Sequence, residues 1–138
     1  MRDGFIKVAA GTPQIRVADC RYNAEQIFTL MREADKQGVR VLALPELCLT
    51  GYTCGDLFLQ RTLQQGALDA LDQVLSASTG LDLVTLVGLP LLLHGKLYNC
   101  AAVVSGGRLL GLVPKTYLPN YAEFYEKRHF VPGSTQVE

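Results

Sequence analysis

The chain has 138 residues, enough for one domain, and its 49% hydrophobic content excludes an intrinsically disordered protein. Lys and Arg together number 13, as do Asp and Glu, so the chain lacks the cationic excess of a non-specific nucleic-acid binder. The N-terminus shows no signal peptide, and the longest uncharged apolar run, residues 83–93, is about half a membrane span. We therefore expect a cytoplasmic protein that binds neither membranes nor nucleic acid.

The first half of the chain alternates predicted strands with predicted helices. Residues 5–10 (FIKVAA) are typical of a short strand. Apolar residues then recur every three or four positions, which predicts a helix capped by Asn23 and extending to about residue 37. The apolar run at 39–45 indicates a strand buried on both faces, and a second helix is predicted over 57–76.

The second half of the chain has the pattern of successive hairpins. Strands are predicted at 83–93, 97–104 and 108–114, and glycine-containing turns at 94–96 and 105–107 separate them. Crossover units followed by hairpins indicate an α/β fold with a mixed sheet.

Two charged residues stand at the ends of predicted apolar strands. Glu46 interrupts 42-LALPELCLTGY-52, and Lys115 directly follows LLGLVP. Functional groups of open α/β sheets gather where strands end, and a carboxylate flanked by apolar residues is suited to act as a general base. The alternatives are a turn glutamate that points into water and a lysine whose stem lies along the sheet edge.

The four cysteines are Cys20, Cys48, Cys54 and Cys100. They form no C-x-x-C motif and have no histidine at zinc-finger spacing, so we expect no metal site. Cys48 and Cys54 flank the Glu46 turn and are the only candidate nucleophiles. Reduced thiols that fill small apolar gaps are the favoured interpretation for all four.

Residues 116–133 are irregular, aromatic and charged, which is typical of a functional segment. His129 lies within this segment, and we expect it to pair with Glu123 or Glu126. His94 lies on a predicted turn, where we expect it to be exposed.

Four segments together resemble the nitrilase (carbon–nitrogen hydrolase) superfamily. They are 6-IKVAAGTPQIRVADCRYN-23, 44-LPELCLTGYTCGDLF-58, 98-YNCAAVVSGGRLLG-111 and 114-PKTYLPNYAEFYEKRHFVPG-133. PELCLTGY is shared widely in the superfamily, whereas CGDLF with PKTYLPNYAEFYEKR resembles the N-terminal glutaminase domain of glutamine-dependent NAD synthetases. The resemblance implies part of an α-β-β-α sandwich and a homo-oligomer.

Members of the superfamily use a Glu, Lys, Cys triad in that chain order. By motif position the resemblance makes Glu46 the general base, Lys115 the triad lysine, Glu123 a further active-site glutamate and Tyr121 a substrate-side tyrosine. The implied reaction is hydrolysis of the glutamine side-chain amide through a thioester. The released ammonia would serve ATP-dependent amidation of nicotinic acid adenine dinucleotide to NAD.

The resemblance places the nucleophilic cysteine after the lysine motif, whereas all four cysteines precede Lys115. We therefore expect residues 1–138 to be the N-terminal part of a single glutaminase domain, without the synthetase domain and inactive alone. Glutamine is the expected ligand, and no cofactor is expected here because ATP and Mg²⁺ would bind the synthetase domain. Two alternatives stay open: another amidase of the superfamily, and a non-catalytic binding or assembly subunit.

Overall fold

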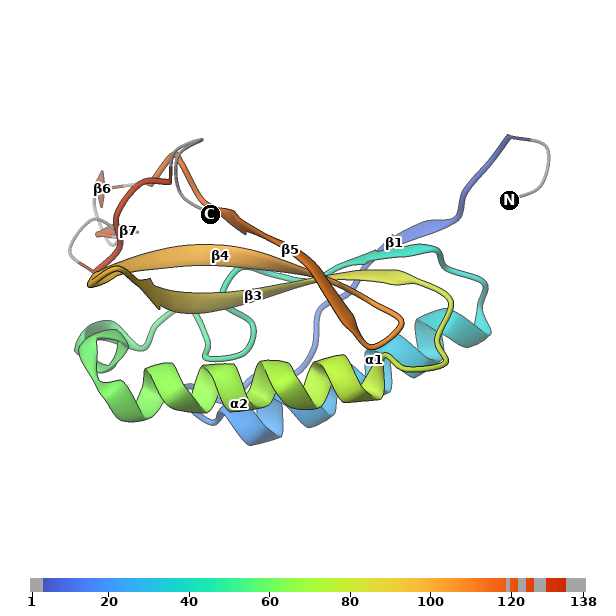
Figure 1. Ribbon diagram of the computed structural model, residues 1–138, viewed down its shortest axis with the longest axis horizontal. Coiled ribbons are helices and arrows are strands. Elements are labelled where there is room, and N and C mark those ends of the chain that lie inside the picture. Colours follow the sequence, from blue (N-terminus) through green and yellow to red (C-terminus); the bar gives the residue numbers. More distant parts are fainter. Residues whose placement is uncertain (1–3, 119, 122–123, 126–128, 134–138) are drawn as a thin grey trace.

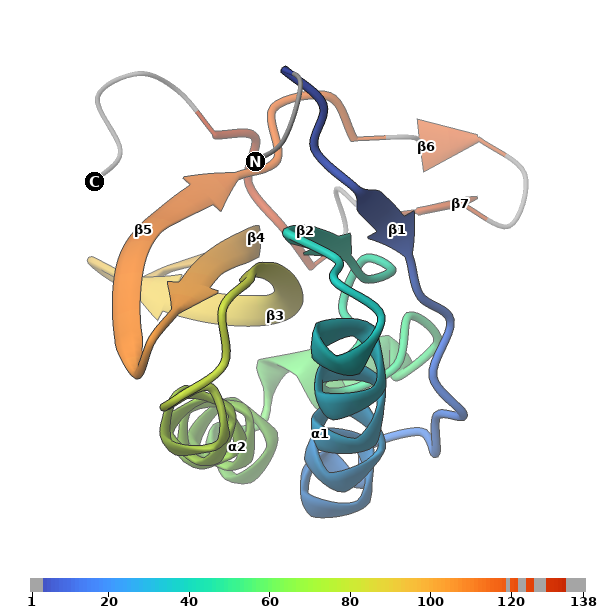
Figure 2. The ribbon, with the colours of Figure 1, turned by 90° about the vertical axis from the view of Figure 1, so that its right-hand side faces the viewer.

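The computed structural model describes residues 4–118 and 129–133, and the backbone of residues 120–121 and 124–125. A five-stranded sheet has both helices on one of its faces (Figures 1 and 2). Helix α1 spans Cys20–Lys36, helix α2 spans Arg61–Ala77, and a short 3-10 helix, η1, spans Gly55–Leu59. In the described part of the chain, no helix is long and apolar enough to cross a membrane.

The strands of the sheet lie in chain order. They are β1 (Val8–Ala10), β2 (Val41–Ala43), β3 (Val84–Leu93), β4 (Lys96–Ser105) and β5 (Arg108–Pro114). The first three strands are parallel, and β3, β4 and β5 are antiparallel. This confirms the predicted α/β fold with a mixed sheet. Two further strands, β6 (Asn120–Tyr121) and β7 (Phe124–Tyr125), pair within the segment for which no regular element was predicted.

The hydrophobic core lies between the helices and the sheet. Ile27 and Met31 of α1 and Val74 of α2 are fully buried against Val87 of β3 and Val104 of β4. Burying one such side chain stabilises a fold by about 1.5–3 kcal/mol. The apolar residues that recur along the helices and those that alternate along the strands therefore form one buried layer.

The N-terminal end of α1 differs from the prediction. The cap is Asp19, whose carboxylate accepts a hydrogen bond from the Tyr22 N–H at 3.1 Å. Asn23 lies inside the helix and is fully buried. Its side chain donates to the carbonyls of Arg16 at 2.9 Å and Leu49 at 3.0 Å, and accepts from the Arg16 N–H at 2.8 Å. The predicted Asn23 cap is wrong because tertiary partners use its amide.

Two other predicted elements are shorter than expected. The helix predicted over 57–76 is divided at Gln60, whose extended backbone separates η1 from α2. The strand predicted over 39–45 is reduced to β2, and its two end residues are only partly buried. Pro45 has no N–H for the ladder, so the chain turns away from the sheet just before Glu46.

Candidate active site

Glu46 leaves the carboxyl end of β2 in a turn that lies against β3. The next residue, Leu47, has a φ of 52°, an uncommon backbone conformation for a bulky residue. Its carbonyl accepts a hydrogen bond from the Gly51 N–H at 2.7 Å, which closes the turn. The Leu49 N–H donates to the Gly88 carbonyl of β3 at 3.1 Å. The sheet therefore fixes the backbone that carries Glu46.

Lys115 directly follows β5, and its backbone is held from two sides. Its N–H donates to the Asn99 carbonyl of β4 at 2.7 Å, and its carbonyl accepts from the Gly133 N–H at 2.8 Å. The Lys115 Nζ lies 2.9 Å from Oε1 and 2.9 Å from Oε2 of Glu46. Glu46 and Lys115, each predicted to stand at the end of an apolar strand and 69 positions apart, thus form an ion pair.

A cavity of about 280 Å³ lies beside this ion pair. Its polar lining includes Glu46, Lys115 and Asn99. Its other walls are mostly apolar residues at the ends of β2 and β5 and within β3 and β4. The Glu46 side chain is 50% exposed and that of Lys115 is 25% exposed. An ion pair this exposed stabilises a fold by about 1 kcal/mol or less. The site therefore offers a small ligand two accessible groups, the Glu46 carboxylate as a proton acceptor and the Lys115 ammonium as a cation.

Asn99 is a site residue that the sequence analysis missed. It is almost fully buried, and its side-chain Nδ2 lies 3.5 Å from Oε2 of Glu46. The sequence did contain a sign of it, since Asn99 is a polar residue within the mostly apolar predicted strand 97–104. Buried polar side chains need hydrogen-bond partners, so such a residue is a candidate for a specific contact.

The cysteines are free and buried, as predicted. Burial raises the pKa of Cys20, Cys48 and Cys100 to about 11, and it also raises the pKa of Cys54. Cys100 borders the cavity, but it alternates with Asn99 along β4, which directs its side chain to the helix-covered face. Because the thiolate is the reactive form, these four thiols are poor nucleophiles at neutral pH.

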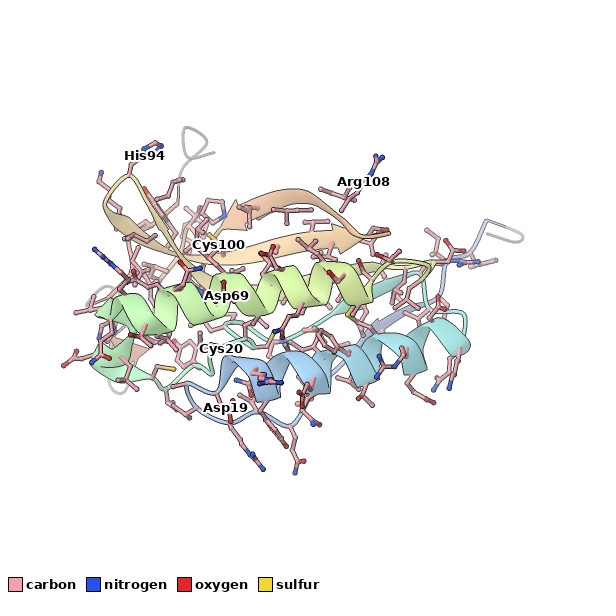
Figure 3. All side chains as sticks on the ribbon, turned by 60° about the horizontal axis from the view of Figure 1, so that its bottom comes forward. Asp19, Cys20, Asp69, His94, Cys100 and Arg108 are labelled. Carbon is pink, nitrogen blue, oxygen red and sulfur yellow. The ribbon has the colours of Figure 1, made fainter. Side chains whose placement is uncertain are left out.

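Neither histidine lines the cavity beside the ion pair. His94 is exposed at the tip of the β3–β4 hairpin, as predicted (Figure 3). The Nε2 of His129 lies 3.0 Å from Oδ1 of Asp56, a contact between η1 and the segment after β7 that the sequence did not predict. The partners expected for His129, Glu123 and Glu126, lie outside the described residues.

Of the predicted substrate-side residues, Tyr121 is described only as backbone of β6, and Glu123 is again among the residues outside the description. Among the described side chains, no group of three or more His, Cys, Asp or Glu is arranged to hold a metal ion. The described chemistry of the site therefore comes from Glu46, Lys115 and Asn99.

The chain is similar to known proteins in both sequence and fold. The chain is 38% identical over 133 residues to the glutamine-dependent NAD(+) synthetase of Mycobacterium leprae, covering 96% of this chain and 20% of that protein. It is 40% identical over 130 residues to that of Mycobacterium tuberculosis, covering 94% of this chain and 19% of that protein. The crystal structure of a glutamine-dependent NAD(+) synthetase from Cytophaga hutchinsonii matches with a TM-score of 0.86 and 31% identity, covering 92% of this chain and 22% of that chain.

The chain thus spans about a fifth of the length of these relatives. Residues 7–138 match the family model of the carbon–nitrogen hydrolases. The chain therefore belongs to the carbon–nitrogen hydrolase family.

Proposed function

We propose that residues 1–138 are the N-terminal part of a single glutaminase domain. This domain would release ammonia from glutamine within a glutamine-dependent NAD synthetase. The observation that carries the proposal is the contact of the Lys115 ammonium with both carboxylate oxygens of Glu46, at 2.9 Å each, beside a cavity. The 38–40% identity to NAD synthetases supports the choice of glutamine as the substrate.

In the proposed reaction, Glu46 removes the proton of a cysteine thiol, and the thiolate attacks the side-chain amide carbon of glutamine. The tetrahedral intermediate collapses by breaking the C–N bond, and Glu46 returns the proton to the departing ammonia. Water, activated by the same carboxylate, then hydrolyses the thioester to glutamate. Lys115 stabilises the oxyanion that forms in both steps.

We propose that the nucleophilic cysteine comes from outside residues 1–138. Burial of all four described thiols, with pKa values raised above the usual range, supports this assignment. The isolated segment is then expected to be inactive. The ammonia produced by the complete protein would be used in ATP-dependent amidation of nicotinic acid adenine dinucleotide.

The cavity is suited to a small neutral amide. Glu46 and Lys115 have opposite charges that sum to zero, and the remaining walls are mostly apolar. Its volume of about 280 Å³ is close to the roughly 300 Å³ at the lower end of small-molecule pockets. An uncharged carboxamide avoids the cost of placing a further unpaired charge beside these walls.

The test is ammonia release from glutamine by the complete gene product. We expect Glu46→Gln to lower kcat by about 10²–10⁴-fold, since a carboxamide cannot accept the thiol proton. Glu25→Gln is the matched control, because Glu25 lies on the exposed face of α1, where it pairs with Arg21. A Glu46→Gln enzyme with the turnover of the Glu25→Gln enzyme would rule out the proposed base.

A further inference from the structure

We infer that Gly88 and Gly133 are positioning residues that set the spacing between Glu46 and Lys115. Gly88 lies outside the four segments of the resemblance and Gly133 ends the fourth, but neither was given a role from the sequence. The inference rests on the proposed function, because it concerns the geometry of that reaction.

Gly88 allows the Glu46 turn to lie directly on β3. A Cβ at this position would be 2.3 Å from the Leu47 nitrogen, 2.8 Å from the Pro45 oxygen and 2.9 Å from the Glu46 carbonyl carbon. All three are backbone atoms, so no side-chain rotation relieves the overlap. Gly88 lies in β3, where it pairs regularly with Ala101 of β4, and it has no positive φ. The turn therefore requires the absence of a Cβ at this position and not an unusual backbone conformation.

Gly133 has the same relation to Lys115. A Cβ there would be 2.7 Å from Cβ and 2.8 Å from Cγ of Pro114, and 2.9 Å from the Pro114 oxygen. The proline ring is fixed to its own backbone and cannot rotate away. The Gly133 N–H also donates to the Lys115 carbonyl at 2.8 Å, so a shift of this segment would move the lysine backbone.

The two glycines therefore act on the two members of one ion pair. Gly88 determines how closely the Glu46 turn approaches the sheet. Gly133 determines how closely its own segment packs on the end of β5, next to Lys115. A side chain at either position forces a displacement on the order of 1 Å, which in an active site costs about 10²-fold in rate. The 2.9 Å contact is expected to lengthen in either variant.

The experiment measures kcat and KM for ammonia release from glutamine by the complete gene product. Gly88→Ala and Gly133→Ala are compared with Gly111→Ala, a glycine of β5 whose added Cβ would meet nothing within 4 Å. We expect kcat to fall by roughly 10- to 100-fold in the first two variants, with KM changed by less than about threefold. The control is expected to keep the kcat of the unmodified enzyme.

The outcomes separate this inference from the proposed function. If Glu46→Gln abolishes turnover while Gly88→Ala and Gly133→Ala keep kcat, the positioning role is wrong and the proposed base stands. If Glu46→Gln is active, the proposed function itself fails. Crystal structures of the variants give a second readout, in which a carboxylate–ammonium distance unchanged from 2.9 Å would overturn the inference. Failure of both variants to fold, while Gly111→Ala folds, would assign the glycines to folding and also overturn it.

Discussion

Leu47 connects Glu46, the proposed base, to the hydrophobic core. Its side chain is buried while its backbone occupies the left-handed region, a conformation that costs about 1–3 kcal/mol for a residue other than glycine. Anchoring Leu47 inside the molecule leaves its neighbour Glu46 at the surface of the cavity. At the scale of single residues, a strained and buried neighbour therefore holds the proposed base in place.

The buried thiols provide a prediction at the same scale. Because burial raises the pKa of Cys100 to about 11, its thiolate fraction increases only as the pH rises from 9 towards 11. We expect iodoacetamide to leave Cys100 unmodified in the native protein at pH 8. Modification should become faster above pH 9 and be complete in urea at pH 8, as quantified by peptide mass spectrometry.

Cys48 is the matched comparison, because its pKa is raised to about 11 for the same reason. The two sites should therefore respond to pH alike. Rapid native labelling of Cys100 alone at pH 8 would show a reactive thiol beside the cavity, and Cys100 would then become the candidate nucleophile.

Elements defined by local signals were predicted well. The β3–β4–β5 hairpins follow from alternation and from turn glycines, and Gly106 and Gly107 indeed have positive φ values. The predicted Asn23 cap failed because of distant partners. Asn23 has a sequence typical of a cap, but its amide reaches Leu49, 26 positions away. His129 contacts Asp56 across 73 positions, a contact that the sequence did not predict, and its pairing with Glu123 or Glu126 stays a prediction because both glutamates lie outside the described residues.

The strand before Lys115 ends where it was predicted to end, whereas β2 ends two residues before the end of the predicted strand 39–45. The approach of Glu46 to Lys115 could be seen only from the order of the strands in the sheet. Each residue was found by the rule that charges interrupting apolar strands are functional candidates. Their 2.9 Å contact arises because β2 and β5 lie on either side of the β3–β4 pair. A glycine in the middle of a strand is a known sign of close backbone approach, so Gly88 could have been found from the sequence.

Asn23 yields a prediction about how α1 supports the site. Asn23→Ala removes the donor to the Leu49 carbonyl and both hydrogen bonds to Arg16. Leaving these backbone groups unpaired should lower the free energy of unfolding by about 3 kcal/mol, measured by urea denaturation. Thr29→Ala in the same helix is the control, because its hydroxyl contacts only a helix carbonyl at the exposed surface. Equal effects of the two substitutions would contradict this role for Asn23.

The whole molecule has two different sheet faces. The helices cover one face (Figure 2). On the other face, Val113 is 58% exposed, and Leu86, Ala101 and Val103 are only partly buried. Three of these residues also line the cavity. A surface that packed on this apolar face would therefore also limit solvent access to Glu46 and Lys115.

This open face predicts self-association of the 138-residue chain when it is produced alone. Apolar surface of this kind is removed from water by contact between copies. We expect light scattering after size-exclusion chromatography to show oligomers or aggregates, and Val113→Glu to shift the distribution towards monomer. A stable monomer of the unmodified chain would contradict the prediction.

The central claim is that Glu46 and Lys115 act as one catalytic unit on the glutamine amide. A double-mutant cycle on ammonia release by the complete gene product, with Glu46→Gln, Lys115→Ala and both together, tests it most directly. Because removing one of two cooperating groups already removes most of the effect of the other, we expect the double variant to be only slightly slower than the slower single variant. Losses that multiply, or a Lys115→Ala enzyme with full turnover, would contradict it.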